Sequence, residues 1–183
     1  MILVDTPIWP WRDGLWGHMV SDVSFQELHQ FAQRLGKRRI GFQGDHYDID
    51  QGEHQRAVEM GATTIDSREL VRRLRDSGLR RRDKRPPWEI AYQSEEIQPF
   101  NTLIEIVSNA ISSEADCLRL LNVLTSANSN PEVLGALIVQ RAGASAMVLE
   151  FGEGPELDTA GLDLFVESRS EDTAVFELII GNC

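Results

Sequence analysis

The pattern of hydrophobic and polar positions divides the chain into two parts with different element orders. In the first part, short apolar runs at 2–5, 38–42 and 62–66 predict three buried strands. Segments with apolar residues at helical spacing follow the runs, so helices are expected between and after the strands. The order β-α-β-α-β-α predicts a small α/β unit with a three-stranded parallel sheet and right-handed crossovers.

Helix boundaries are marked most clearly at two places in this first part. Ser24 and Glu27 have the spacing of a capping box, in which each side chain accepts a hydrogen bond from an otherwise unpaired N–H. Asp66 begins a second segment of the same kind, which ends near Gly78. Residues 6–23 contain two prolines and two glycines and are predicted to form a long loop.

The second part has helical stripes first and strands afterwards. Apolar residues at helical spacing predict helices over 103–111, 113–124 and 131–138, the last introduced by an Asn-Pro cap. Strands are expected at 145–151, 162–168 and 173–180. This order is typical of an α+β domain with three helices and a three-stranded meander. The predicted organisation is an α/β domain at 1–80, a basic and proline-containing linker at 81–98, and an acidic α+β domain at 99–183.

Charge is distributed unevenly between the two parts. The net charge is −11, yet residues 1–90 carry a balance of +1 and residues 91–183 a balance of −12. All four histidines lie within the first 54 residues. Because histidine is the side chain most often used for proton transfer near neutral pH and for metal binding, chemistry is expected in the first part.

Apolar runs, the first residues and the cysteines indicate where in the cell the protein is expected. The chain has no apolar run of about 18 residues, which argues against a membrane-spanning helix. Its start has no basic stretch ahead of the apolar residues, so no secretory signal is expected. The two cysteines, Cys117 and Cys183, form neither a CxxC pair nor a disulfide framework. These features favour a reduced, cytoplasmic setting.

Candidate functional residues gather where the three expected strands end. Ligands of open parallel sheets bind outside the carboxyl ends of the strands. Acidic and imidazole side chains that map to this rim are Asp5, His18, Asp22, Asp45, His46, Asp48 and Asp66. Asp5, Asp22, Asp45 and His46 are candidate metal ligands, for Mg²⁺ or Mn²⁺ if oxygen dominates and for Mn²⁺, Fe²⁺ or Zn²⁺ if histidine takes part. His18, His46 and Asp48 are the candidate catalytic groups.

Structural roles explain some of the same residues. Asp66 has the position of a helix N-cap, and His29 lies on the flank of an apolar stripe. His54 is expected on a polar helix surface. His18, His46 and Asp45 fit either a functional site or a network of polar loop contacts.

Two further features allow two interpretations each. Trp9, Trp11 and Trp16 either stack on a ring-bearing ligand or fold over the sheet edge as a lid. The arginine-rich segment 72–85 either contacts nucleic acid, or it docks against the acidic half of the chain or is simply solvated.

Several short blocks in the first part resemble one family. WGHMVSD, SFQELHQFAQRLG, RRIGFQGDHYD and RAVEMGATTI occur in this order, and together they resemble the bacterial and phage family called domain of unknown function 4031, marked by an HYD motif. The resemblance covers about residues 1–80 and implies no reaction. It points to Asp5, Trp16, His18, Asp22, Glu27, His29, Phe31, Arg39, His46, Tyr47 and Asp48.

Three functional hypotheses follow. The favoured one is a metal-dependent hydrolase that acts on an unidentified small-molecule or phosphate-bearing substrate, such as a phosphate ester. The second is a nucleotide- or nucleic-acid-binding module that uses Arg72–Arg85 and the loop Trp9–Trp16. The third is an interaction protein whose acidic half binds a basic partner.

Overall fold

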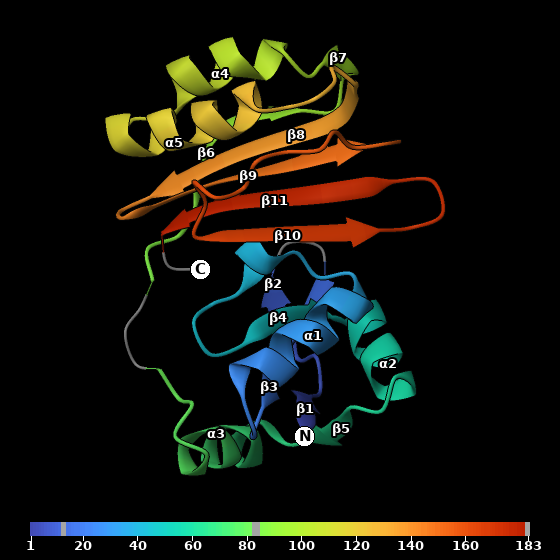
Figure 1. The fold of residues 1–183 in the computed structure, drawn as a ribbon. Coiled ribbons are helices and arrows are strands. Elements are labelled where there is room, and N and C mark those ends of the chain that lie inside the picture. The colour runs from blue at the N-terminus through green and yellow to red at the C-terminus, as the bar shows by residue number, and fades with distance from the viewer. Residues whose placement is uncertain (12–13, 82–84, 182–183) are drawn as a thin grey trace. The chain divides into compact units, whose positions relative to one another are not determined.

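The chain divides into two compact units, Met1–Arg85 and Pro86–Cys183. The structure is a computed structural model and describes residues 1–11, 14–81 and 85–181 (Figure 1). Both units combine helices with a β-sheet, which confirms the expected α/β class. In the described ranges, no helix has the length and apolar character needed to cross a membrane. Cys117 is a free thiol, and Cys183 lies outside the described residues.

The first unit is built on a mixed sheet. Its strands are β1 (Ile2–Asp5), β2 (Trp9–Trp11), β3 (Gly14–Ser21), β4 (Tyr47–Asp50) and β5 (Thr63–Ile65). Its helices are α1 (Phe25–Leu35), α2 (Gln51–Glu59) and α3 (Ser67–Asp76), with a 3-10 turn at Arg39–Gly41. The strand order is β2-β3-β1-β5. β4 is off this path and pairs with β3 on the side opposite to β1 and β2. Only β1 and β5 are parallel, while β3 is antiparallel to its three neighbours.

Two expectations for this unit are wrong. The run 38–42 is not a strand, because β3 and β5 already occupy both sides of β1 and leave no edge for it. The segment 6–23 is not a loop but carries the whole of β2 and β3. Its breakers are tolerated because Pro10 lies on an edge strand and Gly17 marks a close approach of another backbone. The three-stranded parallel sheet is therefore replaced by a five-stranded mixed one.

The two faces of this sheet have different roles. Side chains alternate between faces along a strand. Val4, Met19 and Tyr47 belong to the cluster that packs against α1 and α2. Leu3 and Val20 point to the other face, where they pack against α3. Asp5 lies two positions after Leu3 on β1, and His18 lies two positions before Val20 on β3. Both side chains therefore lie on the face covered by α3.

The predicted helix ends at Ser24, Gly36 and Asp66 are confirmed, but the reciprocal half of the predicted capping box is not observed, because the Glu27 carboxylate accepts hydrogen bonds from the Met1 amino group and Ser21 Oγ instead. The Ser24 side chain accepts a hydrogen bond from Glu27 N at 3.1 Å, and Gly36 ends α1 with a φ of 87°. Asp66 caps α3 by accepting hydrogen bonds from Arg68 N and Glu69 N. Asp66 thus has the structural role that its spacing indicated.

The second unit is an antiparallel sheet with two helices on one face (Figure 1). Its helices are α4 (Thr102–Ala110) and α5 (Glu114–Thr125). Its strands are β6 (Glu89–Ser94), β7 (Gln98–Pro99), β8 (Glu132–Arg141), β9 (Ala144–Phe151), β10 (Leu164–Arg169) and β11 (Ala174–Gly181). The order is β10-β11-β9-β8-β6, with β7 paired to β8. β6 and the first residue of β7 lie within the segment 81–98 that is expected to be a linker.

The helix expected at 131–138 is wrong, because these residues form most of β8. The polar pair that suggested a helix cap has other partners. Asn130 Oδ1 accepts a hydrogen bond from Asn101 N at 2.8 Å, and the Pro131 carbonyl accepts one from Phe100 N at 2.9 Å. β8 fills the gap between β9 and β6, and its buried Val133 and Ile138 complete the core of this unit. Pairing on both sides outweighs the helical spacing of the apolar residues.

Candidate metal centre

Three side chains of the first unit come together on the face covered by α3. His18 on β3 and Asp48 on β4 are direct partners in the antiparallel register. His46 precedes Asp48 by two residues, and its ring centroid lies 5.2 Å from that of His18. One ligand atom from each of His18, His46 and Asp48 lies within 4.8 Å of the other two. Two imidazoles and one carboxylate at this separation match the first coordination shell of a transition-metal ion.

His18 is held in place by Asp5. The Asp5 carboxylate accepts hydrogen bonds from His18 Nδ1 at 3.1 Å and from the His18 backbone N–H at 2.6 Å. Ser67 Oγ, at the start of α3, donates a third at 2.6 Å. Burial raises the pKa of Asp5, but the hydrogen bonds from His18 and Ser67 outweigh it and hold this pKa below its usual value. Because Nδ1 is used in this way, Nε2 is the His18 nitrogen available to a metal.

His46 is held in the same way by Asp45. The chain turns sharply between Phe42 and Tyr47, where Gly44 has a φ of 101°. Within this turn, His46 Nδ1 donates to Asp45 Oδ1 at 2.6 Å. The other Asp45 oxygen accepts hydrogen bonds from Arg81 N at 2.8 Å and from the Arg80 guanidinium at 3.2 Å. His46 Nε2 lies 3.4 Å from Asp48 Oδ1.

The electrostatics of this cluster favour a positive charge between the carboxylates. Burial lowers the pKa of His46, but Asp45 and Asp48 outweigh burial through hydrogen bonds and charge and raise this pKa to about 9. The pKa of Asp48 is lowered in return, because the hydrogen bond and charge of His46 outweigh the effect of burial. A divalent cation would be an alternative source of this positive charge, and its binding would release the His46 proton.

The cluster opens into a pocket of about 230 Å³. Asp5 and Asp45 are fully or almost fully buried, whereas the His18 and Asp48 side chains keep 36% and 42% of their surface exposed. The lining residues are Asp5, Trp9, His18, Val20, His46, Ser67, Leu70, Val71, Leu74 and Arg80. The groups that orient the imidazoles are thus shielded from water, while the candidate ligands are accessible to a substrate.

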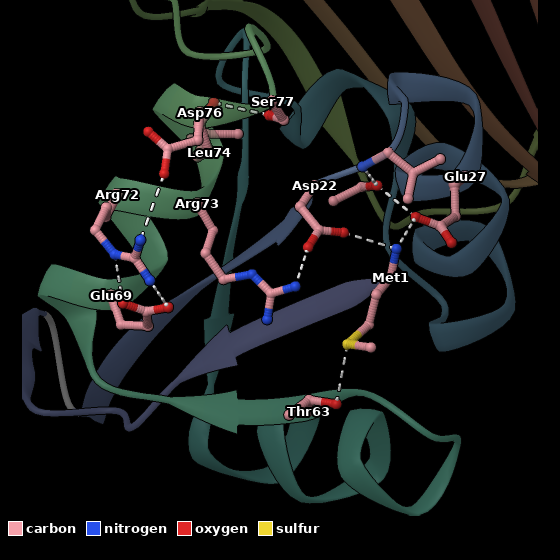
Figure 2. A network of polar contacts seen from close by, with 12 residues as sticks. Met1, Asp22, Glu27, Thr63, Glu69, Arg72, Arg73, Leu74, Asp76 and Ser77 are labelled. Carbon is pink, nitrogen blue, oxygen red and sulfur yellow. Dashed lines mark hydrogen bonds and ion pairs between the residues drawn. The ribbon is translucent and has the colours of Figure 1, made fainter.

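The structure separates Asp22 from the other expected metal ligands. Because β3 runs antiparallel to β1, its end lies beside the start of β1, away from Asp5. Asp22 Oδ1 accepts a hydrogen bond from the Met1 amino group at 2.9 Å, and its Oδ2 pairs with Arg73 at 2.5 Å (Figure 2). The expected convergence of Asp22 on the site is therefore wrong. Asp5 and Asp45 reach the site but pair with the histidines, so Asp48 is the candidate carboxylate ligand.

Three other residues that the resemblance pointed to have different surroundings. Trp16 shares the face of His18, and its indole N–H donates to the Trp11 carbonyl at 3.0 Å. Tyr47 points to the opposite face, where its hydroxyl lies 2.9 Å from His29 Nδ1. Arg39 lies in the same aromatic cluster, with its guanidinium 5.7 Å from the centroid of the Phe42 ring. Of the HYD motif, His46 and Asp48 therefore line the site and Tyr47 belongs to the core.

Sequence reasoning missed two contributors, Gly17 and Ser67. A Cβ atom on Gly17 would lie 2.7 Å from the Asp5 carbonyl oxygen and 2.9 Å from Asp5 Oδ1, so only glycine allows this contact without a shift. The signal for Gly17 was a glycine directly before His18 in a segment interpreted as a loop. Ser67 gave no signal of its own, because its role depends on the end of β1 meeting the start of α3.

Most described arginines of the segment 72–85 have partners within the first unit. Arg72 pairs with Glu69 and Asp76, and Arg73 pairs with Asp22 (Figure 2). Arg81 and Arg85 lie over the rings of Phe25 and Phe42. Arg80 pairs with Asp45, Arg75 and Arg80 line a second pocket, and Arg82 and Lys84 lie outside the described residues. The segment is thus not a uniform basic patch.

The fold and the site together define a small mixed α/β domain with a candidate centre of two histidines and one carboxylate. Residues 2–77 match the family described as Protein of unknown function (DUF4031), which confirms the resemblance of the first unit to this family. No curated protein and no solved structure matched the chain.

Proposed function

We propose that this protein is a cytoplasmic metal-dependent hydrolase of phosphate esters, with His18, His46 and Asp48 as the metal ligands. The observation that supports the proposal is the pairing of each imidazole Nδ1 with its own buried aspartate. Metal-binding histidines characteristically donate their second nitrogen to a carboxylate, which fixes the tautomer and the orientation of the ring. Both histidines of the cluster have this arrangement.

The ligand set limits the choice of metal. Two imidazole nitrogens and one carboxylate oxygen favour Zn²⁺, Mn²⁺ or Fe²⁺ over Mg²⁺, which prefers oxygen ligands. Three protein ligands leave at least one coordination position for water, as catalytic rather than structural zinc sites do. A metal in such a site supplies a bound water whose pKa falls to about 7.

The proposed reaction is the hydrolysis of a phosphate ester by water. The oxygen of a water molecule forms a bond to phosphorus, and the ester P–O bond to the leaving group breaks. The water loses one proton to solvent, and the leaving alkoxide takes one proton to become an alcohol. Arg80 lines the same pocket and pairs with Asp45, and its guanidinium carries further N–H donors that favour binding of the anionic phosphate.

Metal binding is tested first by thermal unfolding of the full chain with Zn²⁺, Mn²⁺, Fe²⁺ and Mg²⁺. A metal at a hundred times its dissociation constant adds about 2.7 kcal/mol to the free energy of unfolding, enough to raise Tm by a few degrees. His46→Ala should abolish this shift, and His54→Ala, which changes a histidine on α2, should keep it. The absence of a shift with every metal would reject the proposal. Hydrolysis of bis(p-nitrophenyl) phosphate with the metal that raises Tm then tests the activity.

A further inference from the structure

An exposed aromatic platform adjoins the candidate metal centre. Trp9 and Trp11 lie two residues apart on β2 and therefore point to the same face of the sheet. Trp9 is paired with Trp16 across the strands, and the Trp11 ring lies 5.1 Å from that of Trp16. Trp16 in turn shares its face with His18, and Trp9 lines the pocket of the metal centre.

The exposure of these rings distinguishes the platform from a hydrophobic lid. Trp9 and Trp11 each keep 53% of their surface exposed. A lid that folds over the sheet edge buries its aromatic side chains, because their contribution to stability comes from removing them from water. Large exposed aromatic side chains beside a polar pocket are instead typical of a binding surface.

A second pocket extends the site toward the end of α3. It has a volume of about 310 Å³ and is lined by Val71, Arg75, Gly78 and Arg80. Val71 and Arg80 also line the pocket of the metal centre, so the two pockets adjoin. Arg75 and Arg80 are both exposed, and although Arg80 pairs with Asp45 at 3.2 Å, both guanidinium groups place N–H donors beside the two pockets. Aromatic rings and arginines thus border the candidate metal centre together.

We propose, on the basis of the hydrolase function above, that the substrate is single-stranded nucleic acid. Indole rings stack on bases of any sequence, and arginines bind the phosphates between them. Trp9 and Trp11 would stack on successive bases, while Arg75 and Arg80 bind the backbone. A duplex fits poorly, because its bases are already stacked and paired and do not reach the platform.

Cleavage of the strand consumes one water molecule and no other co-reactant. The water oxygen bonds to the phosphorus of one phosphodiester, and one of its two ester P–O bonds breaks. The products are a strand that ends in a phosphate monoester and a strand that ends in a hydroxyl group, which takes up a proton. The proton released by the water goes to solvent.

Binding is measured first, with the full chain and an oligothymidylate of about 12 nucleotides in EDTA, so that cleavage does not interfere. Trp9→Ala should weaken binding about tenfold or more, since stacking on one aromatic ring contributes on this scale, and Trp9→Phe should restore most of it. Arg75→Ala should reduce the slope of log K against log salt by about 0.7, the value for one phosphate contact on a single strand. Arg34→Ala, an exposed arginine on α1, is the matched control and should change neither quantity.

The outcomes separate this inference from the hydrolase proposal. Absent binding at low salt, or a Kd that Trp9→Ala leaves unchanged, overturns the nucleic-acid assignment even where metals still raise Tm. Binding without cleavage in the presence of the stabilising metal also overturns it. His46→Ala should still bind the oligonucleotide in EDTA but should not cleave it when the metal is added. This result would separate binding of the strand from the metal requirement of cleavage. If no metal raises Tm, the hydrolase proposal fails on its own measurement.

Discussion

His18 lies directly opposite Asp48 in the antiparallel pair of β3 and β4. Residues in such positions have Cβ atoms about 5 Å apart on the same face, so both side chains reach one ion. His46 precedes Asp48 by two residues and therefore projects to the same side as Asp48. A register shift of one residue would turn Asp48 to the opposite face. The candidate metal centre thus depends on the register between two strands that are separated by α1.

Replacing Asp5 by Asn should lower metal affinity about 10- to 100-fold without unfolding the protein. The amide keeps the size of the carboxylate but loses the charge that accepts hydrogen bonds from His18 and Ser67, and partners of metal-bound histidines have effects of this size. Calorimetric titration with Zn²⁺ measures the change. Asp22→Asn is the control and should leave affinity unchanged, because Asp22 pairs with Met1 and Arg73. Equal losses in both variants would contradict the assignment.

Replacing Gly17 by Ala should destabilise the first unit by about 1–3 kcal/mol, the usual cost of inserting an atom where none fits. The new methyl group would lie 2.7 Å from the Asp5 carbonyl oxygen, so β1 and β3 must move apart next to His18. Urea denaturation measures the loss. Gly14→Ala on the same strand is the matched control, because its nearest neighbour is 3.7 Å away. An unchanged midpoint for Gly17→Ala would show that the contact between the two strands is looser than described.

Replacing Tyr47 by Phe should reduce stability by about 1 kcal/mol and leave metal affinity unchanged. The variant removes the hydroxyl that pairs with His29 in the core, and a typical buried hydrogen bond contributes about this amount. Asp48→Asn, one residue away on the opposite face, should instead reduce metal affinity with little effect on folding. Denaturation and metal titration of both variants test the pair. Loss of metal binding in Tyr47→Phe would place the tyrosine at the site after all.

Stability should fall between pH 6.5 and pH 4 because of His29. Burial lowers the pKa of His29, and the charges of Arg39 and Arg85 lower it further, to about 4. The unfolded chain, with a histidine pKa near 6.5, then binds a proton in this window that the folded chain does not. The free energy of unfolding therefore decreases as pH falls, by at most about 3 kcal/mol in total.

His29→Gln removes this titration, so its stability should change less steeply with pH over the same window. The measurement is the free energy of unfolding from urea titrations at several pH values, with His54→Gln as the control. His46 does not contribute to the change in stability between pH 6.5 and pH 4. Its pKa is raised to about 9, so its stabilising contribution is lost only as pH rises from about 6.5 through 9. A slope that His29→Gln leaves unchanged would mean that His29 is protonated in the folded state.

The local features of the fold were predictable, and the pairing of the strands was not. Caps at Ser24 and Asp66 depend on side chains within three residues of their partners, so the sequence contains the whole interaction. The segment 131–138 shows the opposite case, because its apolar spacing suits a helix while vacant edges of β6 and β9 make it a strand. Long-range pairing outweighs local preference in such segments.

The candidate site shows the same division. The sequence identified His18, His46, Asp45, Asp48 and Asp5 as a polar group near strand ends, for a parallel sheet that does not form. β3 is antiparallel to β1, and this removes Asp22 from the group and brings His18 beside Asp5. The error in topology therefore removed Asp22, and Asp66 serves as the cap of α3, while the other five members of the predicted group remain together.

By itself, the sequence determined the α/β class, the helix ends in the first unit, the uneven charge and the stretch of chain that carries the histidines. Each of these depends on composition or on residues close together in the chain. The tertiary structure alone decided which residues are candidate ligands and which orient them. That distinction requires the register of β3 with β4, the contact of Ser67 with Asp5 and the burial of Asp45, all set by packing between distant segments.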